Sequence, residues 1–267
     1  MAKEDRGAFI WYELMTPDVA GAKAFYDAVV GWEVDANPSM PESVVDYRMI
    51  KRADGGLAGG VLALSQDMID GGAGPGWLGY IHVADLDATA QAMTDAGGAI
   101  HMPPHDMEGV GRMAMVADPW GATIYLMTPT PPPENLDARS DVFSATEAQR
   151  IRWNELWSSD PKAAVDLYGG LFGWRQEGAM PMGPLGDYMF IQHGETGIGA
   201  ISPTMPGGEG PRWNYYIGVD DIDRAVAAIR DHGGALLDEP QQIPGGEYSV
   251  HVRDPQGADI GFVGPRK

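Results

Sequence analysis

Hydrophobic residues at the start of the chain follow two different spacings. Residues 8–15 are rich in aromatic and aliphatic side chains and indicate a strand, whereas residues 19–30 place apolar side chains three and four positions apart, as a helix does. Asp18 precedes the helical stretch and Gly31 follows it. Because Asp is a preferred N-cap and Gly a preferred C-cap, these two residues predict the ends of the helix.

Further strands complete this unit, and the unit then restarts. Strands are predicted over 47–51 and 57–64, around the turn Asp54-Gly55-Gly56. A second unit follows, with a strand over 78–83, a helix over 86–96 after the cap Asp85, and short strands near 99, over 112–117 and over 122–127. The pattern predicts strand–helix–strand–strand–strand, twice.

The whole pattern is then repeated in the second half of the chain. Matching segments are Trp11-Tyr12-Glu13-Leu14 with Trp153-Asn154-Glu155-Leu156, Gly31-Trp32 with Gly173-Trp174, Tyr47 with Tyr188, and Asp118-Pro119-Trp120-Gly121 with Asp254-Pro255-Gln256-Gly257. A repeat of this length indicates a duplicated domain. We predict an α+β protein with domains at 1–128 and 150–267, joined by the Pro-rich linker 129–149.

Composition narrows the classes of partner. Lys and Arg number 18 against 38 Asp and Glu, and the net charge of −20 opposes binding to nucleic acid or an anionic membrane and favours a neutral or cationic ligand. There is no cysteine, which excludes disulfides and thiolate chemistry. No apolar run is long enough for a membrane span and the first residues do not look like a signal peptide, so a cytoplasmic protein is expected. A duplicated chain can complete its clefts internally, which favours a monomer, and a homodimer stays open.

The order of these signals resembles the vicinal oxygen chelate superfamily, which includes glyoxalase I, bleomycin-resistance proteins and extradiol dioxygenases. The residues that carry the resemblance are the helix-opening Asp18, the pair Gly31-Trp32, and the turn that begins at Asp118, each with a counterpart in the second copy. The resemblance implies a tandem duplication of a glyoxalase-like domain. It also implies four βαβββ modules whose curved mixed sheets enclose clefts.

Metal-dependent members of that superfamily place His, Gln or Glu at set positions on the cleft strands. By resemblance, the corresponding positions here are Trp11, Leu78, Tyr125, Trp153, Asn214 and Gly261. The metal ions of the family need oxygen or imidazole ligands that converge on one point. None of these six positions carries the His, Gln or Glu that the family uses for this purpose. We therefore predict no cofactor and a metal-free cleft, while a divalent metal held by other residues stays open.

Strand alternation assigns other residues to the same faces. Glu13 and Glu155 recur beside tryptophans, and a carboxylate next to indole rings can act as an acid or base or pair with a cation. A structural carboxylate is an equal alternative. The candidate catalytic residues are Glu13, Glu155, His82 and Tyr125, and the candidate substrate-binding residues are Trp11, Trp153, Tyr80, Tyr216, Asn214, Asp259, Trp77 and Trp213.

The remaining tryptophans, aspartates and histidines that stand out in the sequence are expected to be structural. Trp32 and Trp174 follow helix-stopping glycines and should pack in the core, and Asp118 and Asp254 should serve the turn before the last strand. His101 and His105 are predicted in a surface loop with two prolines, and His251 in a strand without a partner pattern.

The sequence pattern and the resemblance lead to two hypotheses about function. The first is a glyoxalase/bleomycin-resistance-type protein that binds a small organic molecule, planar or cationic, in an aromatic and acidic cleft. The second is a lyase or isomerase of glyoxalase-like type, with a cleft glutamate as general acid/base and with or without a divalent metal.

Overall fold

A computed structural model describes residues 6–39, 45–206 and 210–267 of the chain. The first residues, on which the expectation of a missing signal peptide rests, lie outside these ranges. No helix in the described ranges is both long and apolar enough to cross a membrane.

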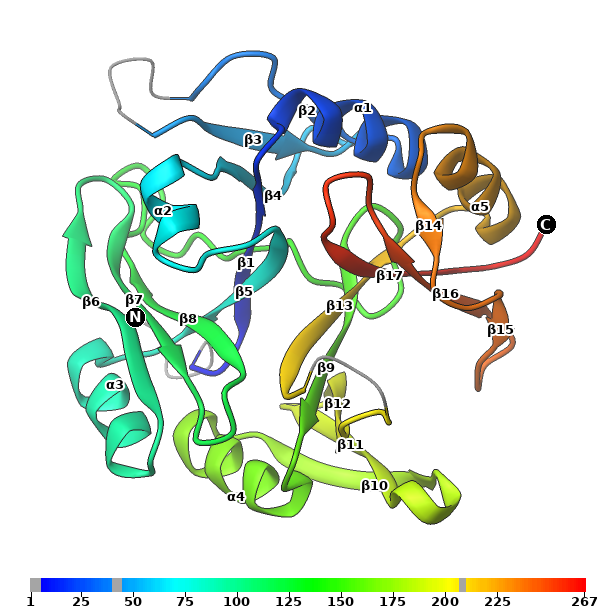
Figure 1. The fold of residues 1–267 in the computed structure, drawn as a ribbon. Coiled ribbons are helices and arrows are strands. Elements are labelled where there is room, and N and C mark those ends of the chain that lie inside the picture. Colours follow the sequence, from blue (N-terminus) through cyan, green and yellow to red (C-terminus); the bar gives the residue numbers. More distant parts are fainter. Residues whose placement is uncertain (1–5, 40–44, 207–209) are drawn as a thin grey trace. The chain divides into compact units, whose positions relative to one another are not determined.

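The first copy folds into one sheet with three helices (Figure 1). Its elements are β1 (Phe9–Thr16), α1 (Val19–Val30), β2 (Glu33–Val34), β3 (Tyr47–Lys51), β4 (Leu57–Ala63), α2 (Gln66–Asp70), β5 (Gly76–His82), α3 (Leu86–Asp95), β6 (Ala99–Met107), β7 (Gly111–Ala117) and β8 (Thr123–Pro129). The strand order is β2-β3-β4-β1-β5-β8-β7-β6, with β1 parallel to β4 and β5 parallel to β8.

The second copy repeats this arrangement. Its elements are β9 (Ile151–Ser158), α4 (Pro161–Phe172), β10 (Arg175–Pro181), the short 3-10 helix η1 (Gly183–Leu185), β11 (Asp187–His193), β12 (Thr196–Pro203), β13 (Arg212–Gly218), α5 (Ile222–Asp231), β14 (Ala235–Leu236), β15 (Gln241–Gln242), β16 (Tyr248–Arg253) and β17 (Asp259–Gly264). The order β10-β11-β12-β9-β13-β17-β16-β14 matches that of the first copy. The predicted α+β fold with four strand–helix–strand–strand–strand modules is confirmed.

Local signals set the helix ends as predicted. The Asp18 carboxylate accepts a hydrogen bond of 3.0 Å from Gly21 N, and Asp160 accepts one of 3.1 Å from Ala163 N in the second copy. Such an N-cap contributes about 1 kcal/mol of stability. Gly31 and Gly173 end α1 and α4 with φ of 78° and 75°, a left-handed conformation that glycine adopts without a steric penalty.

Two predictions about local structure were wrong. Residues 66–70, for which no element was predicted, form α2, because the Ser65 hydroxyl caps the turn at Met68 N. His101 and His105 lie in β6 rather than in a loop. The prolines at 103 and 104 are tolerated there because β6 is the last strand of the sheet, where a missing N–H on the outer side breaks no ladder.

Packing groups the modules differently from their order in the chain. One compact unit, here the first unit, contains the segment ending at Ile10 together with Gly79–Ser140 and Trp153–Trp213. The other, the second unit, contains Trp11–Leu78, Asp141–Arg152 and Asn214–Lys267. Each unit therefore combines the first module of one copy with the second module of the other.

In the second unit, α1 and α5 lie side by side (Figure 1). Their apolar faces are buried, with Phe25 and Ile229 no more than 1% exposed. Gly234, just after α5, allows this close approach, because a Cβ at that position would lie 2.7 Å from the ring of Phe25.

A buried chain of hydrogen bonds crosses the same core. Trp77 Nε1 donates to the Tyr26 hydroxyl at 2.9 Å, and that hydroxyl donates to Asp254 Oδ2 at 2.9 Å. The other oxygen of Asp254 accepts the backbone N–H groups of Gln256 and Ala258, both at 2.9 Å. The expected turn role of Asp254 is confirmed, and the bond to Tyr26 adds a link between the copies.

The first unit contains the equivalent arrangement with the roles of the two copies exchanged. The Tyr168 hydroxyl lies 3.2 Å from Asp118 Oδ2 and accepts Trp213 Nε1 at 3.3 Å. Asp118 Oδ1 accepts backbone N–H groups at 120 and 122. In both units a tyrosine from the first helix of one copy thus holds the turn of the other copy.

The remaining core tryptophans behave as predicted. Trp32 and Trp174 are 4% and 6% exposed. Trp32 Nε1 donates to the Gln149 carbonyl at 2.9 Å in the second unit, and Trp174 Nε1 donates to the Gly7 carbonyl at 2.8 Å in the first. Each indole therefore anchors a connecting segment against its unit.

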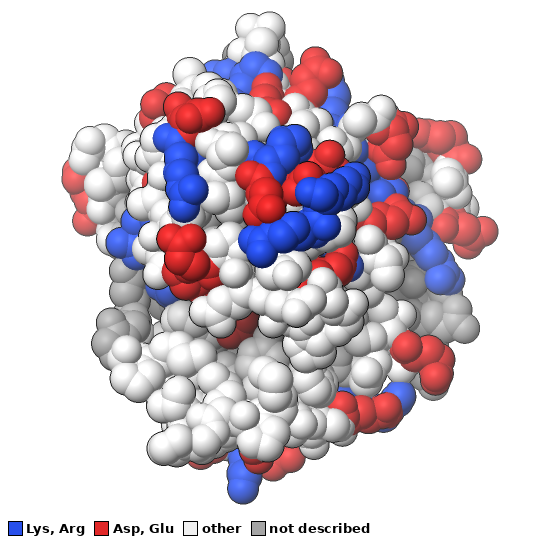
Figure 2. All heavy atoms as spheres, turned by 90° about the vertical axis from the view of Figure 1, so that its right-hand side faces the viewer, with Lys and Arg blue, Asp and Glu red and all other residues white. Residues whose placement is uncertain are grey.

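Charged side chains are mixed on the surface. Acidic and basic residues lie next to one another on the face drawn in Figure 2. In the second unit, Arg52 and Arg150 both pair with Asp54 and Asp141. The Arg52 side chain is only 2% exposed, so this network fixes the segment that contains Asp141.

Candidate functional site

Each module has one sheet face against its helix and one face turned away from it. On β1, Tyr12 and Leu14 are fully buried on the helix side, whereas Trp11 and Glu13 lie on the other face. On β9, Trp153 and Glu155 alternate in the same way with Asn154 and Leu156. The predicted alternation therefore places both glutamates on the faces turned away from the helices.

In the first unit, Glu155 is the centre of a hydrogen-bonded aromatic group, here called the Glu155 cluster. Trp153 Nε1 donates to the Tyr188 hydroxyl at 2.7 Å, and that hydroxyl donates to Glu155 Oε2 at 3.2 Å. Trp157 Nε1 donates to the other carboxylate oxygen of Glu155. Glu155 is 3% exposed, and its two carboxylate oxygens accept hydrogen bonds from an indole and a phenol.

The electrostatics of the Glu155 cluster follow from this burial. Burial, and then the negative charge of Glu155, raise the pKa of Tyr188 well above its ordinary value. The Arg212 guanidinium lies 4.7 Å from the centre of the Trp157 ring, within the range of a cation–π contact. Phe190 lies edge-on to both Trp153 and Tyr188. The result is an aromatic wall with one carboxylate inside it.

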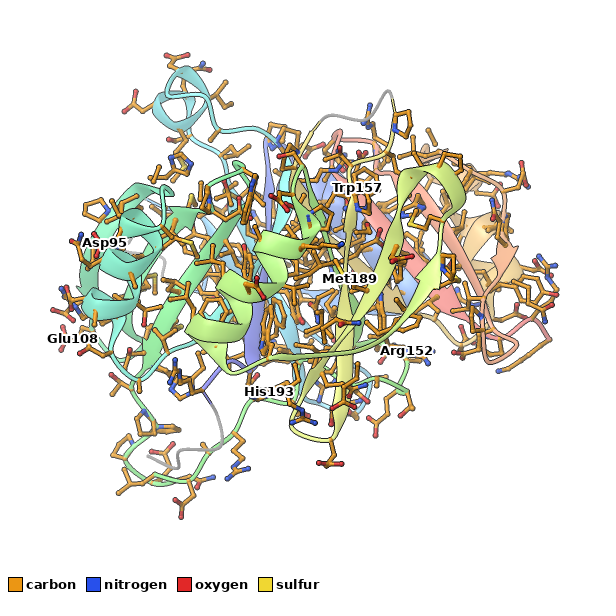
Figure 3. All side chains as sticks on the ribbon, turned by 90° about the horizontal axis from the view of Figure 1, so that it is seen from below. Asp95, Glu108, Arg152, Trp157, Met189 and His193 are labelled. Atoms are coloured by element: carbon orange, nitrogen blue, oxygen red, sulfur yellow. The ribbon has the colours of Figure 1, made fainter. Side chains whose placement is uncertain are left out.

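One residue of this wall, Trp157, is labelled in Figure 3. Trp157 and Met189 lie over the strands of the second copy, whereas Asp95 and Glu108 lie near α3 in the same unit. Phe190 pairs with Ala200 and Ala200 with Glu155, so the wall spans three adjacent strands at one level.

The second unit holds the first-copy counterpart, the Glu13 cluster of Trp11, Glu13 and Tyr47. Trp11 Nε1 donates to the Tyr47 hydroxyl at 2.7 Å, and Glu13 is 3% exposed. Gly60 pairs with Glu13, and a Cβ at Gly60 would collide with the Tyr47 hydroxyl. The two clusters differ in composition, since Met15 stands where the second copy has Trp157, and Met49 stands where it has Phe190.

Tyr47 and Tyr188 were missed as site residues. The signal that identifies them was present, because the two tyrosines recur at equivalent positions of the repeat. Their contact with the glutamate face depends on strand pairing between separate segments, which the repeat alone does not reveal.

The predicted residues on the second module of the first copy gather in the first unit. Tyr80 and Tyr125 stack with ring centres 4.1 Å apart. His82 is 5% exposed, and no hydrogen-bond partner within the described residues reaches either of its ring nitrogens. This face therefore carries two stacked phenols and a buried imidazole.

The equivalent module of the second copy, in the second unit, carries Asn214, Tyr216 and Asp259. Tyr216 is hydrogen-bonded to His251, a histidine to which the sequence assigned no role. The Arg253 guanidinium donates two hydrogen bonds to the Asp259 carboxylate, from Nε to Oδ1 at 2.7 Å and from Nη2 to Oδ2 at 3.0 Å. Asp259 therefore has its charge balanced by an arginine on the neighbouring strand.

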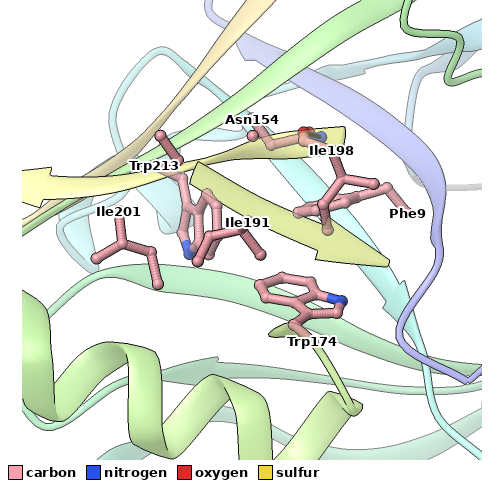
Figure 4. A pocket seen from close by; sticks show the side chains of 9 residues that line it. Phe9, Asn154, Trp174, Ile191, Ile198, Ile201 and Trp213 are labelled. Carbon is pink, nitrogen blue, oxygen red and sulfur yellow. Dashed lines mark hydrogen bonds between the residues drawn. The ribbon is translucent and has the colours of Figure 1, made fainter. Parts of the chain in front are cut away.

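Trp77 and Trp213 lie elsewhere. Both donate to buried tyrosines of the core and are 5% and 8% exposed. Figure 4 shows Trp213 with Phe9 and Trp174 around a small apolar space in the first unit, which has no room for a water molecule. The structure does not bring these two tryptophans to the glutamate clusters.

The residues present do not fit a family-type metal centre. At the six positions implied by the resemblance stand two tryptophans, a leucine, a tyrosine, an asparagine and a glycine, none of which supplies a carboxylate or imidazole. Within the described ranges, no three His, Asp or Glu side chains converge to form a ligand set.

Comparison with known proteins agrees with this architecture. The family model described as Glyoxalase/Bleomycin resistance protein/Dioxygenase superfamily matches residues 8–126 and 150–262. The chain is 31% identical over 260 residues to the "Putative glyoxylase CFP32" of Mycobacterium tuberculosis, covering 96% of this chain and 94% of the relative. It is 29% identical over 275 residues to the "Anthracycline biosynthesis protein DnrV" of Streptomyces peucetius, covering 96% and 93%.

Solved structures share the fold at low sequence identity. The Mn(II)-bound glyoxalase from Novosphingobium aromaticivorans aligns with a TM-score of 0.62 and 15% identity, over 98% of this chain and 83% of that one. Homoprotocatechuate 2,3-dioxygenase from Arthrobacter globiformis aligns with a TM-score of 0.64 and 18% identity, over 98% and 80%. The family match over both copies is decisive: the chain belongs to the glyoxalase/bleomycin resistance protein/dioxygenase superfamily.

Proposed function

We propose that this protein binds a small planar organic molecule, neutral or cationic, against the Glu155 cluster. The observation that carries the proposal is the arrangement of Trp153, Tyr188 and Trp157 around one buried carboxylate. Aromatic walls with a few convergent polar groups are the usual composition of a small-molecule site. Trp153 is only half-buried, which leaves part of its ring available for stacking.

The chemistry of the ligand follows from the wall and the charge. Indole faces favour planar rings, and a buried carboxylate favours a cationic or hydrogen-bond-donating group. The net charge of −20 works against anions at long range. Relatives named for anthracycline biosynthesis support a planar polycyclic ligand, because anthracyclines are planar aromatic compounds that carry an amino sugar.

A binding titration tests this proposal. Doxorubicin, a planar cationic probe, is titrated against the protein and followed by tryptophan quenching, with a neutral anthraquinone in parallel. We expect saturable binding of both probes, and Trp153→Leu should weaken both about tenfold by removing a stacking surface. Glu155→Gln should weaken the cationic probe about tenfold and the neutral one much less.

The first copy supplies the matched control. Trp11→Leu and Glu13→Gln make the same changes at the Glu13 cluster, which lacks the second tryptophan. Both variants should leave the affinity of the Glu155 cluster unchanged. Absence of saturable binding, or binding that is insensitive to Trp153 and Glu155, would rule out this location.

A lyase or isomerase activity is the second candidate. It is favoured by the hydrogen bond between the Tyr188 hydroxyl and Glu155, because a phenol that donates to a carboxylate can exchange a proton with it. If a bound ligand is turned over, Glu155→Gln should lower the rate by about 100-fold or more while retaining most of the affinity. An unchanged turnover rate in this variant would exclude Glu155 as the acid or base.

A further inference from the structure

The second module of the second copy carries a group of polar residues that the proposed binding does not use. This module lies in the second unit, and its helix face is closed by buried residues such as Tyr215, Val250 and Phe262. The alternate positions of β13, β16 and β17 face away from α5. They are Asn214, Tyr216, His251, Arg253, Asp259 and Gly261.

Two residues on this face, Tyr216 and His251, form a continuous hydrogen-bonded relay with Asp238, which lies in the connection between β14 and β15. The Tyr216 hydroxyl lies 2.5 Å from His251 Nε2, and His251 Nδ1 lies 2.8 Å from Asp238 Oδ2. The second oxygen of Asp238 accepts the backbone N–H of His251 at 2.8 Å, which fixes the carboxylate relative to the ring. Because a carboxylate only accepts, Nδ1 carries the proton and Nε2 is left to accept from Tyr216.

The charges around His251 favour this arrangement. Burial alone would raise the pKa of Asp238, but the hydrogen bonds from the ring and backbone of His251 lower it overall, so the carboxylate stays ionised. Next on the same face, Arg253 pairs with Asp259, so that pair adds no net charge. An imidazolium formed at His251 would therefore be stabilised chiefly by Asp238.

A glycine makes the relay possible. Gly261 lies between Tyr216 and His251 in the sheet, paired with both. A Cβ at Gly261 would collide with the Tyr216 ring, so the ring lies across the glycine to reach the histidine. In the first copy, Tyr125 stands at the position that corresponds to Gly261, and its ring stacks on that of Tyr80.

The first copy therefore lacks the relay. The residue that pairs with Tyr125 on the adjacent strand is Met115, which stands where the second copy has His251. Tyr80 is the counterpart of Tyr216 in the first copy, and its ring stacks on Tyr125.

A hydrogen-bond donor without a partner lies on the same face. Asn214 is 7% exposed, and within the described residues no acceptor reaches its Nδ2. An amide N–H buried without a partner costs about 1–3 kcal/mol, unless a ligand supplies the acceptor. Asn214 precedes Tyr216 by two residues, so the two side chains point to the same side of the strand about 7 Å apart.

We propose that Tyr216 is a general acid–base group, assisted by His251 and Asp238, that transfers a proton at the carbon next to the carbonyl of a planar ketone whose oxygen accepts from Asn214. Tyr216 is the catalytic residue, and His251 and Asp238 are positioning residues. The proposal goes beyond binding at the Glu155 cluster and uses residues of the other unit.

The step balances without an oxidant or reductant. The Tyr216 proton moves to His251 Nε2 as the phenolate oxygen takes a proton from the substrate carbon. The C–H electron pair becomes the C=C bond of an enolate, and the carbonyl π pair moves to the oxygen that Asn214 stabilises. Return of a proton to carbon regenerates the ketone, and His251 returns the proton to Tyr216.

The first test measures the tautomer of His251 by nitrogen-15 NMR of the whole protein. Neutral imidazole in water prefers its proton on Nε2, so a proton on Nδ1 reports the hydrogen bond to Asp238 that the relay requires. We expect the Nδ1–H form at about pH 9, well above the ordinary pKa of imidazole. Asp238→Asn should shift the ring towards Nε2–H. A proton on Nε2 in the unmodified protein, or two protons on the ring at this pH, would overturn the relay.

The second test measures proton transfer. The probe is 2-tetralone, and exchange of its α-protons for deuterium is followed by NMR in D₂O. We expect exchange above the buffer rate, lowered about 100-fold in Tyr216→Phe and about tenfold in Asp238→Asn. Leu136→Ala, at an exposed side chain outside this module, should retain the full rate. Exchange no faster than buffer, or equal exchange in Tyr216→Phe, would overturn the proposal.

The two proposals fail separately. The doxorubicin titration reports only on the Glu155 cluster in the first unit, and the tautomer and exchange measurements report only on Tyr216, His251 and Asp238 in the second unit. A failed doxorubicin titration therefore leaves the relay standing, and a failed exchange assay leaves the binding proposal standing.

Discussion

The hydroxyl of Tyr26 donates a hydrogen bond of 2.9 Å to Oδ2 of Asp254, which lies 228 residues further along the chain. Tyr26 belongs to the first helix of the first copy and Asp254 to the last turn of the second. The equivalent hydrogen bond, from a tyrosine of the second copy to an aspartate of the first, joins Tyr168 to Asp118. Duplication thus produced two equivalent bonds, each of which ties one copy to the other inside a core.

Loss of either bond should destabilise the fold. Tyr26→Phe removes a donor from a buried carboxylate and an acceptor from Trp77, so we expect the free energy of unfolding to fall by about 1–3 kcal/mol. Urea unfolding measures this, with Tyr168→Phe as the symmetric variant. Leu136→Ala, at a side chain that is 70% exposed, should change almost nothing. Equal stability of Tyr26→Phe and the unmodified protein would show that the bond contributes nothing.

On acidification, the contribution of a buried carboxylate to folding stability should rise, whereas that of an ion-paired carboxylate should fall. Burial raises the pKa of Asp254, so the folded state binds its proton more readily than the unfolded state does. The penalty of this carboxylate is present above its folded pKa and is relieved as the pH falls below it. Relative to Asp254→Asn, the unmodified protein should therefore gain stability on acidification through this range.

Asp141 provides the contrasting case. Its hydrogen bond from Arg52 lowers the pKa of Asp141, so the stabilisation is present above the unfolded pKa and is lost as the pH falls through the folded value. Relative to Asp141→Asn, the unmodified protein should lose stability on acidification. Urea unfolding over a pH series measures both differences. Slopes of the same sign for the two aspartates would contradict this assignment.

Substitution of Gly60 or Gly261 should lower stability, because a tyrosine side chain packs directly against each glycine. Gly60→Ala should displace Tyr47 from Trp11, and Gly261→Ala should displace Tyr216 from His251. We expect losses of about 1–3 kcal/mol for each, measured by thermal and urea unfolding. Gly170→Ala is the control, because it lies in α4 with open space around a Cβ, and there alanine should add about 0.5–1 kcal/mol. A stabilised Gly261→Ala would disprove the described packing of Tyr216.

Metal content is expected to be low. Protein purified without an affinity tag should contain well below one equivalent of Zn, Ni, Fe or Mn by plasma mass spectrometry, because the family's donor positions lack suitable donors. Treatment with a chelator should leave the unfolding midpoint unchanged. One equivalent or more, lost together with stability on chelation, would require a ligand set that includes other residues.

Local features of the site were predictable. The alternation along β1 and β9 placed Glu13 and Glu155 beside Trp11 and Trp153 on one face, because side-chain direction in a strand depends only on position along it. Trp77 was not predictable in this way. It was expected at a ligand site and lies in the core, because its direction follows from a hydrogen bond to Tyr26 that no local pattern records.

The sequence by itself determined the duplication, the four modules and the helix ends. These features are set by periodicity, by caps that act within one turn, and by residue type at a given position. The tertiary structure alone decided the contacts between copies and the relay of Tyr216, His251 and Asp238. Those residues lie on three separate segments, and only the register of β13, β16 and β17, with a glycine at 261, brings Tyr216 and His251 within hydrogen-bonding distance.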